Sequence, residues 1–182
     1  LGRVVRQPAI WLITFLFVIG MGLNQGVFAV MPLYLNVERG LASDGSNLLL
    51  ALSRAVAFGV PLAGGWLADR YGVQRVMFGT LVGAVLGTSA TVWLPNPWLW
   101  LALILQACAS VSIFPLCFTL ISQVTAPEAR AVAVAVVVPV AHLLGAGLVP
   151  LGIGLLAEAG RFDLGFIILA VATGLTLPGL LV

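Results

Sequence analysis

Six apolar runs follow one another along this chain, and each is long enough to cross a lipid bilayer. A bilayer core about 30 Å thick needs about 20 helical residues, and charges, prolines and turn residues separate the runs. Only 8% of the 182 residues are charged, whereas 62% are hydrophobic. A soluble domain carries about 25% charged residues, so this chain has too few to cover a water-exposed surface. The runs extend over about residues 8–35, 46–67, 76–94, 98–124, 132–157 and 164–182.

The short connections between these runs predict a single bundle. We expect an all-α membrane protein in which residues 1–182 form six antiparallel transmembrane helices, with the lipid bilayer as solvent. The scattered arginines do not form the basic patch that binds nucleic acid. We also expect no metal, no cofactor and no enzymatic activity. Because the chain begins at Leu1 and stops at Val182 inside an apolar run, we expect a piece of a longer polypeptide.

The arginines in the connections predict the orientation of the bundle, because short loops rich in arginine stay on the cytoplasmic side. Five arginines fall on the side of the N-terminal flank, and two fall on the opposite side. Both ends of the chain are therefore expected in the cytoplasm, in a plasma or inner membrane. The larger group is Arg3, Arg6, Arg70, Arg75 and Arg130, and the smaller group is Arg39 and Arg161.

A few polar residues lie far from the ends of the runs, where a polar group is costly and usually functional. Arg54 is about 15 Å below Asp44 along a helix, and His142 is about 18 Å from Arg130, so both fall near the middle of the bilayer. The third and sixth runs carry nothing more polar than Ser, Thr or Gly at this depth. We therefore expect runs one, two, four and five to line a cavity. The candidate substrate-binding residues are Arg54, Asn24, Gln25, Gln106 and His142.

Arg54 is the most demanding of these residues, because a guanidinium keeps its charge in a protein. All six acidic residues lie at the ends of runs, so none is expected beside it. Its partner is a carboxylate from a missing part of the protein, an anionic ligand, or water reached by snorkelling. His142 is either a proton-exchanging group or a neutral hydrogen-bonding residue. For the three amides, hydrogen bonding between helices is the alternative to a cavity role.

Glycines and prolines predict close packing in one run and bending in another. Gly79, Gly83 and Gly87 recur every four residues on the third run, which favours close approach of a neighbouring helix. Pro139 and Pro150, with several glycines between and after them, predict kinks in the fifth run.

A motif closes the second run and carries a resemblance to a known family. The spacing G-x-x-x-D-R-x-G-x-x-R resembles the loop signature of the major facilitator superfamily of secondary transporters. In that family the motif is thought to hold one helical bundle against the other, which is a conformational role. Gly65 would permit close helix approach and Gly72 a tight turn. The matching residues are Gly65, Asp69, Arg70, Gly72 and Arg75.

The resemblance implies twelve helices in two six-helix halves, each of which lines the cavity with its first, second, fourth and fifth helices. An arginine often found in the fourth helix of the first half is replaced here by Leu103, and residues 3–8 resemble the end of a cytoplasmic linker. We therefore expect the C-terminal half, with the N-terminal half as its partner. The implied function is alternating-access transport of a small solute, an organic or inorganic anion if Arg54 binds it.

Three other functions compete with anion transport. One is efflux of a drug or metabolite by proton antiport, with Arg54 in an internal ion pair, and another is a receptor or scaffold that transports nothing. The third is an intramembrane serine protease, with Ser110 or Ser112 as nucleophile and His142 as base. The segment around these serines lacks the G-x-S-G turn that such an enzyme needs for its oxyanion geometry, which disfavours it.

Overall fold

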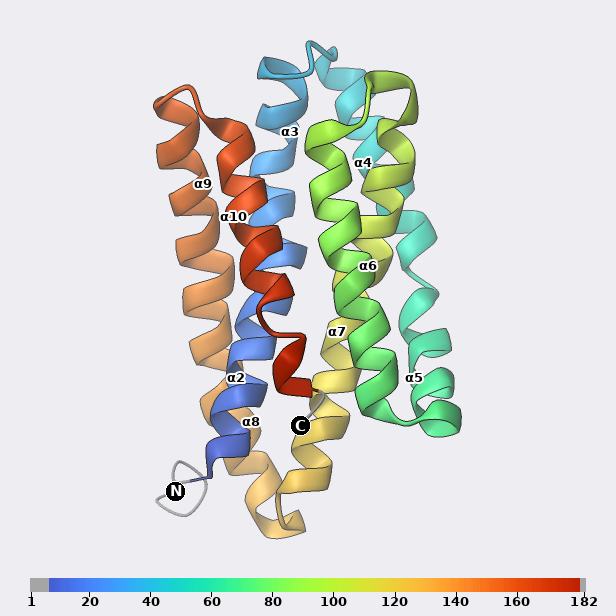
Figure 1. Ribbon diagram of the computed structural model, residues 1–182, viewed down its shortest axis with the longest axis vertical. Coiled ribbons are helices and arrows are strands. Elements are labelled where there is room, and N and C mark those ends of the chain that lie inside the picture. Colours follow the sequence, from blue (N-terminus) through green and yellow to red (C-terminus); the bar gives the residue numbers. More distant parts are fainter. Residues whose placement is uncertain (1–6, 181–182) are drawn as a thin grey trace.

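The computed structural model describes residues 7–180. Within that range six helical spans cross the molecule in alternating directions (Figure 1). This confirms the six predicted runs, whose ends shift by a few residues. Arg3 and Arg6, on which part of the orientation prediction rests, lie outside the described residues. The spans are Pro8–Val37, Ser43–Tyr71, Val73–Trp93, Asn96–Val124, Pro127–Glu158 and Phe162–Leu180, called here spans 1 to 6.

Spans 1 and 5 each contain a π-helical segment between two α-helices. Span 1 consists of α2 (Pro8–Met21), η1 (Gly22–Gly26) and α3 (Val27–Val37). Span 5 consists of α8 (Pro127–Ala141), η3 (His142–Leu148) and α9 (Val149–Glu158). The segment η3 lies between the two prolines predicted to bend the fifth run. Wide π turns inside helices are rare and concentrate at functional sites.

Span 2 is broken, and the remaining spans are more regular. It comprises α4 (Ser43–Ala57) and α5 (Val60–Tyr71). Pro61 explains the break, because proline has no backbone N–H and its ring collides with the carbonyl four residues earlier. Span 3 is α6 (Val73–Trp93), and span 4 is the short η2 (Asn96–Trp98) followed by α7 (Leu99–Val124). Span 6 consists of α10 (Phe162–Gly174) followed by the short η4 (Pro178–Leu180).

Span 4 is the centre of the bundle, and α7 contacts helices of spans 1, 2, 3 and 5. Its closest neighbour is span 3. A Cβ atom added to Gly87 would lie 2.6 Å from the backbone nitrogen of Gln106, so only glycine permits this approach. Gly83 faces Ala109 at ordinary contact distance, whereas a Cβ on Gly79 would meet nothing within 4 Å. The predicted glycine ridge therefore packs against span 4 at two of its three positions.

Spans 3 and 6 pack against each other through α6 and α10, on the side of the bundle that faces the viewer in Figure 1. Spans 1 and 4 are largely buried, whereas spans 2 and 5 flank them and leave most of their surface open. The exposed side chains of spans 2 and 5 are mostly apolar, among them Phe58, Leu62 and Leu143. Such surfaces are suited to lipid or to another apolar helical bundle, and not to water.

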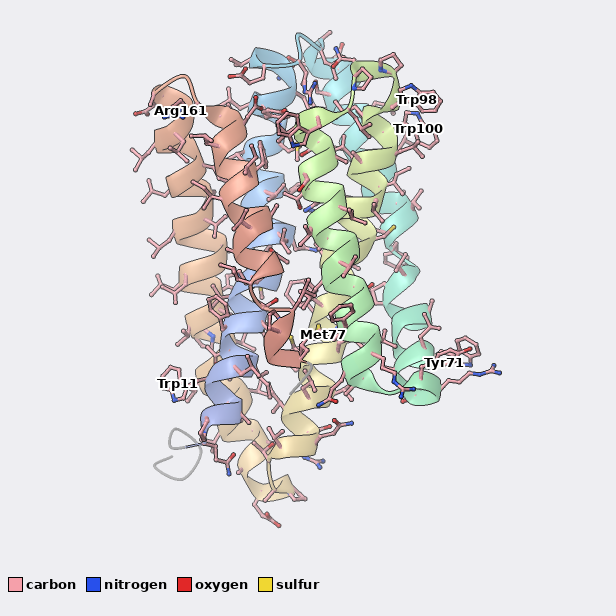
Figure 2. The ribbon with its side chains drawn as sticks, viewed as in Figure 1. Trp11, Tyr71, Met77, Trp98, Trp100 and Arg161 are labelled. Carbon is pink, nitrogen blue, oxygen red and sulfur yellow. The ribbon has the colours of Figure 1, made fainter. Side chains whose placement is uncertain are left out.

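Aromatic and basic side chains mark both ends of the bundle. Trp98, Trp100 and Arg161 lie at one end and Trp11 and Tyr71 toward the other (Figure 2). At the first end Arg39 joins spans 1 and 3: its Nη2 atom donates to the carbonyl oxygens of Thr91 and Val92, and its Nε atom to the hydroxyl of Tyr34. The half of span 1 nearest this end is thereby tied to the end of span 3 and, through the Tyr34 ring, to span 6.

Candidate substrate-binding site

Arg54 reaches across from span 2 to span 1 and makes two contacts there. Its Nη2 atom donates a hydrogen bond of 2.6 Å to the backbone oxygen of Asn24. Its guanidinium carbon lies 4.3 Å from the centre of the Phe28 ring. All six acidic residues lie at span ends, as the sequence indicates. The charge of Arg54 is therefore met by a carbonyl dipole and an aromatic face, a combination that none of the sequence-based alternatives included.

The carbonyl that binds Arg54 belongs to the π-helical segment η1. There the N–H of Val27 bonds to the oxygen of Gly22, five residues earlier, which is the bonding pattern of a π turn. Gln106 of span 4 donates from Nε2 to the oxygen of Leu23 at 2.6 Å. Two consecutive carbonyls of η1 thus accept side-chain donors from two other spans. Membrane helices commonly tolerate irregular backbone in this way.

The π-helical segments of spans 1 and 5 pack directly against each other. A Cβ on Gly26 would lie 2.9 Å from the oxygen of Gly145, and a Cβ on Gly145 would lie 2.6 Å from the Cβ of Met21. No side chain fits at such a crossing, so glycine is required on both helices. This contact holds η1 in place while Arg54 and Gln106 occupy its carbonyls.

The side chain of Asn24 supplies a donor that is still free. Its Nδ2 atom is buried and has no hydrogen-bond partner in the structure. An unmade hydrogen bond of this kind costs about 1–3 kcal/mol. A recess beside Arg54 has a volume of about 10 Å³, enough for about one water molecule. Its walls include Phe28, Ser53, Arg54 and Gln106.

The structure unites three of the five predicted substrate-binding residues. Arg54, Asn24 and Gln106 meet at η1. Gln25 and His142 are exposed and do not line the recess beside Arg54, although they lie on the two π-helical segments that pack together. Their part in substrate binding stays a prediction.

Phe28 belongs to the site but was not predicted from the sequence. It follows Asn24 by four residues, and residues with this spacing share a helix face. That spacing was the available signal. An aromatic residue in an apolar run does not by itself indicate a functional role. Only the contact with Arg54 identifies Phe28 as part of the site.

The loop motif forms a tight turn between spans 2 and 3. Gly72 adopts a φ of +91°, as expected for the turn glycine. Arg70 lies over the rings of Trp66 and Tyr71, and Asp69 is exposed. Within this chain Gly65 has no close neighbour, since a Cβ there would meet nothing within 4 Å. The close approach expected at Gly65 is absent from the described contacts. Arg75 borders a groove with Gln74, Phe78 and Leu180.

The serines considered as nucleophiles are engaged elsewhere. The hydroxyl of Ser110 donates to the oxygen of Ala107, and that of Ser112 donates to the oxygen of Cys108. Both serines are buried, whereas His142 is exposed on another span. The arrangement lacks the serine–histidine hydrogen bond on which nucleophilic catalysis depends.

Comparison with known proteins adds relatives of stated function. A segment of this chain is 30% identical over 104 residues to the "Probable nitrate/nitrite transporter NarK2" of Mycobacterium tuberculosis strain CDC 1551 / Oshkosh. The protein of that name from strain ATCC 25618 / H37Rv matches to the same degree. The matched segment covers 53% of this chain and 25% of the relative.

A family comparison covers much more of the chain. The sequence model of the Major Facilitator Superfamily matches residues 10–182. That range includes all of spans 2 to 6 and most of span 1. The chain therefore belongs to the Major Facilitator Superfamily, and its six apolar helices are those of a multi-pass membrane protein.

Proposed function

We propose that this chain is the C-terminal six-helix half of a twelve-helix secondary transporter, and that the transporter moves a small monovalent anion by alternating access. The observation that carries the proposal is the position of Arg54, a permanent charge in the middle of span 2 that, among residues 7–180, meets only a carbonyl and an aromatic ring. An arginine inside a membrane span is costly, and such residues commonly mark a substrate pathway.

The free donors around Arg54 favour an oxyanion with two coplanar oxygens. A guanidinium carries five N–H groups in a planar fork. The backbone oxygen of Asn24 accepts a hydrogen bond from Nη2 alone. Whichever Nη2 hydrogen is used, one edge of the guanidinium keeps two free N–H donors. Such an edge matches carboxylate-like anions. The unpartnered Nδ2 atom of Asn24, on span 1, is a further donor close to Arg54.

The names of the relatives make nitrate and nitrite the first anions to test. Both are small and planar, and each has two oxygens that fit one edge of a guanidinium. The recess beside Arg54 holds only about one water molecule, so the anion binds on its open side, toward the N-terminal half. Gln25 and His142 are exposed and are available to the solute or to that half.

The complete transporter contains this chain and the N-terminal half as two bundles. The two halves rock about the central site. The transporter lies in the plasma or inner membrane, and both ends of the polypeptide are in the cytoplasm. The loop motif, with Asp69, Arg70 and Arg75 at its surface, contacts the N-terminal half in one access state. The turn at Gly72 and the exposure of Asp69 and Arg70 support that role.

A thermal-shift screen of the full-length purified protein tests this function. Nitrate, nitrite, acetate and chloride are compared with sugars, amines and cationic drugs, on the wild type and on Arg54→Gln. Anions are expected to raise the melting temperature of the wild type only, because a ligand stabilises the state that binds it. Equal stabilisation of both proteins by a cationic compound would instead support the antiport alternative, with Arg54 in an ion pair.

A further inference from the structure

We infer that Phe28 is a positioning residue that orients the guanidinium of Arg54 for the anion. The inference rests on the proposed function and concerns the same site. Phe28 lies on α3, one helical turn after Asn24, and its ring centre is 4.3 Å from the guanidinium carbon. A cation at this distance from an aromatic face is attracted by the ring quadrupole.

Two contacts together fix the arginine. The carbonyl of Asn24 holds Nη2, and the Phe28 ring lies against the guanidinium. Either contact alone would leave the long side chain free to rotate, since arginine has about 2 kcal/mol of rotamer entropy to lose on ordering. With both in place, the free edge of the guanidinium keeps one direction before the anion arrives. Such pre-orientation lowers the entropy cost of binding.

An aromatic ring is suited to this task because it does not compete with the anion. A carboxylate beside Arg54 would occupy the two-donor edge and neutralise the charge. The ring face accepts no such pair of hydrogen bonds, so the net charge and the fork stay available. The ring also borders the recess beside Arg54, together with Ser53, Leu103 and Gln106.

The environment of Phe28 fits this assignment better than a role in the apolar core. Its side chain is 41% exposed, whereas the core phenylalanines Phe17 and Phe166 are fully buried. Those two residues pack against other aromatic rings in tilted or edge-on arrangements. Phe28 forms no ring pair with the residues that the structure describes, and its aromatic face is directed at Arg54.

Progressive fluorination of Phe28 tests the inference, because fluorine weakens the ring quadrupole while changing the shape of the side chain little. The full-length protein in proteoliposomes would carry mono-, di- and trifluorophenylalanine at this position, with uptake of labelled nitrite as the readout. If nitrite fails in the ligand screen, the anion that raised the melting temperature replaces it. The KM is expected to rise with each fluorine, by about 2- to 30-fold over the series, with kcat nearly unchanged.

Phe15 provides the matched control, since it lies on the same span, is 48% exposed and makes no contact with an arginine among the described residues. Fluorination there is expected to leave the KM unchanged. Phe28→Tyr should transport with nearly the wild-type KM, whereas Phe28→Leu should resemble the trifluoro variant. Melting temperatures of all variants are measured alongside, so that loss of folding is recognised.

The outcomes separate this inference from the proposed function. A flat KM across the fluorinated series, while Arg54→Gln abolishes uptake, overturns the role of Phe28 and leaves the anion site standing. A fall in kcat at constant KM also overturns it, because the ring would then act in a conformational step. If Arg54→Gln transports normally, the proposed function itself fails, and the role of Phe28 fails with it.

Discussion

Arg54 and Gln106 donate hydrogen bonds to consecutive carbonyls of the same π-helical turn, those of Asn24 and Leu23, each at 2.6 Å. The two donors come from spans 2 and 4, and the acceptors lie in span 1. The irregular segment of span 1 and the candidate anion site therefore share one hydrogen-bond network. A ligand that draws Arg54 away from Asn24 would alter the support of that segment, which connects binding with the shape of span 1.

Gln106→Leu removes the donor that the carbonyl of Leu23 accepts. Gln106 is only 4% exposed, so water cannot easily replace the hydrogen bond. Hydrogen bonds between membrane helices contribute about 0.6 kcal/mol on average and up to about 1.7 kcal/mol. We expect the full-length protein to lose stability within that range, measured by thermal unfolding in detergent. Gln123→Leu, on the exposed end of the same helix, is the control and should change little.

Gly145→Ala disrupts the crossing between the two π-helical segments. The added methyl group would lie 2.6 Å from the Cβ of Met21 and 2.9 Å from the nitrogen of Gly22. Backbone atoms cannot move aside cheaply, and overpacking of this kind costs about 1–3 kcal/mol. The melting temperature should fall accordingly. Gly147→Ala in the same segment meets nothing within 4 Å, so an equal fall there would contradict the explanation.

Gly72→Ala strains the turn between spans 2 and 3. Gly72 has φ +91° and ψ 139°, a conformation that is almost confined to glycine. The substitution should cost about 1–3 kcal/mol of stability. The comparison is Gly79→Ala on span 3, where a methyl group meets open space and the helix accepts alanine. If both variants melt like the wild type, the turn is not strained by a side chain.

Arg54→Lys separates charge from geometry at the candidate anion site. Lysine keeps the positive charge but cannot present a planar two-donor edge. A hydrogen bond to a charged group contributes about 1.5–3 kcal/mol, so the KM for an oxyanion should rise by about 10- to 150-fold. Uptake by reconstituted full-length protein measures it. Arg161→Gln, exposed at the other end of the bundle from the loop motif, should leave the KM as it is.

Much of the architecture followed from local properties of the sequence. A bilayer requires about 20 apolar residues for each crossing, so six such runs predicted six spans without any knowledge of their contacts. The turn at Gly72 was predicted from its motif, and its positive φ confirms it. Arg54 stood out because a permanent charge in an apolar run is costly wherever it faces.

The contacts of Arg54 were decided by the tertiary structure. Its hydrogen-bond acceptor is a backbone oxygen, and every residue carries one, so no sequence pattern distinguishes that of Asn24. The π-helical turns also change the faces that later residues present. Gln25 and His142, predicted at the same depth as Arg54, are exposed and do not line its recess.

Sequence by itself thus determined which segments cross the membrane and which side chains are costly there, because both depend on the transfer of single residues from water to lipid. Only the tertiary structure decided that Gly22, Gly26 and Gly145 meet, and that Asn24, Phe28 and Gln106 gather around Arg54 and its π-helical turn. Those relationships depend on the register between helices far apart in the chain, and helix periodicity does not encode that register.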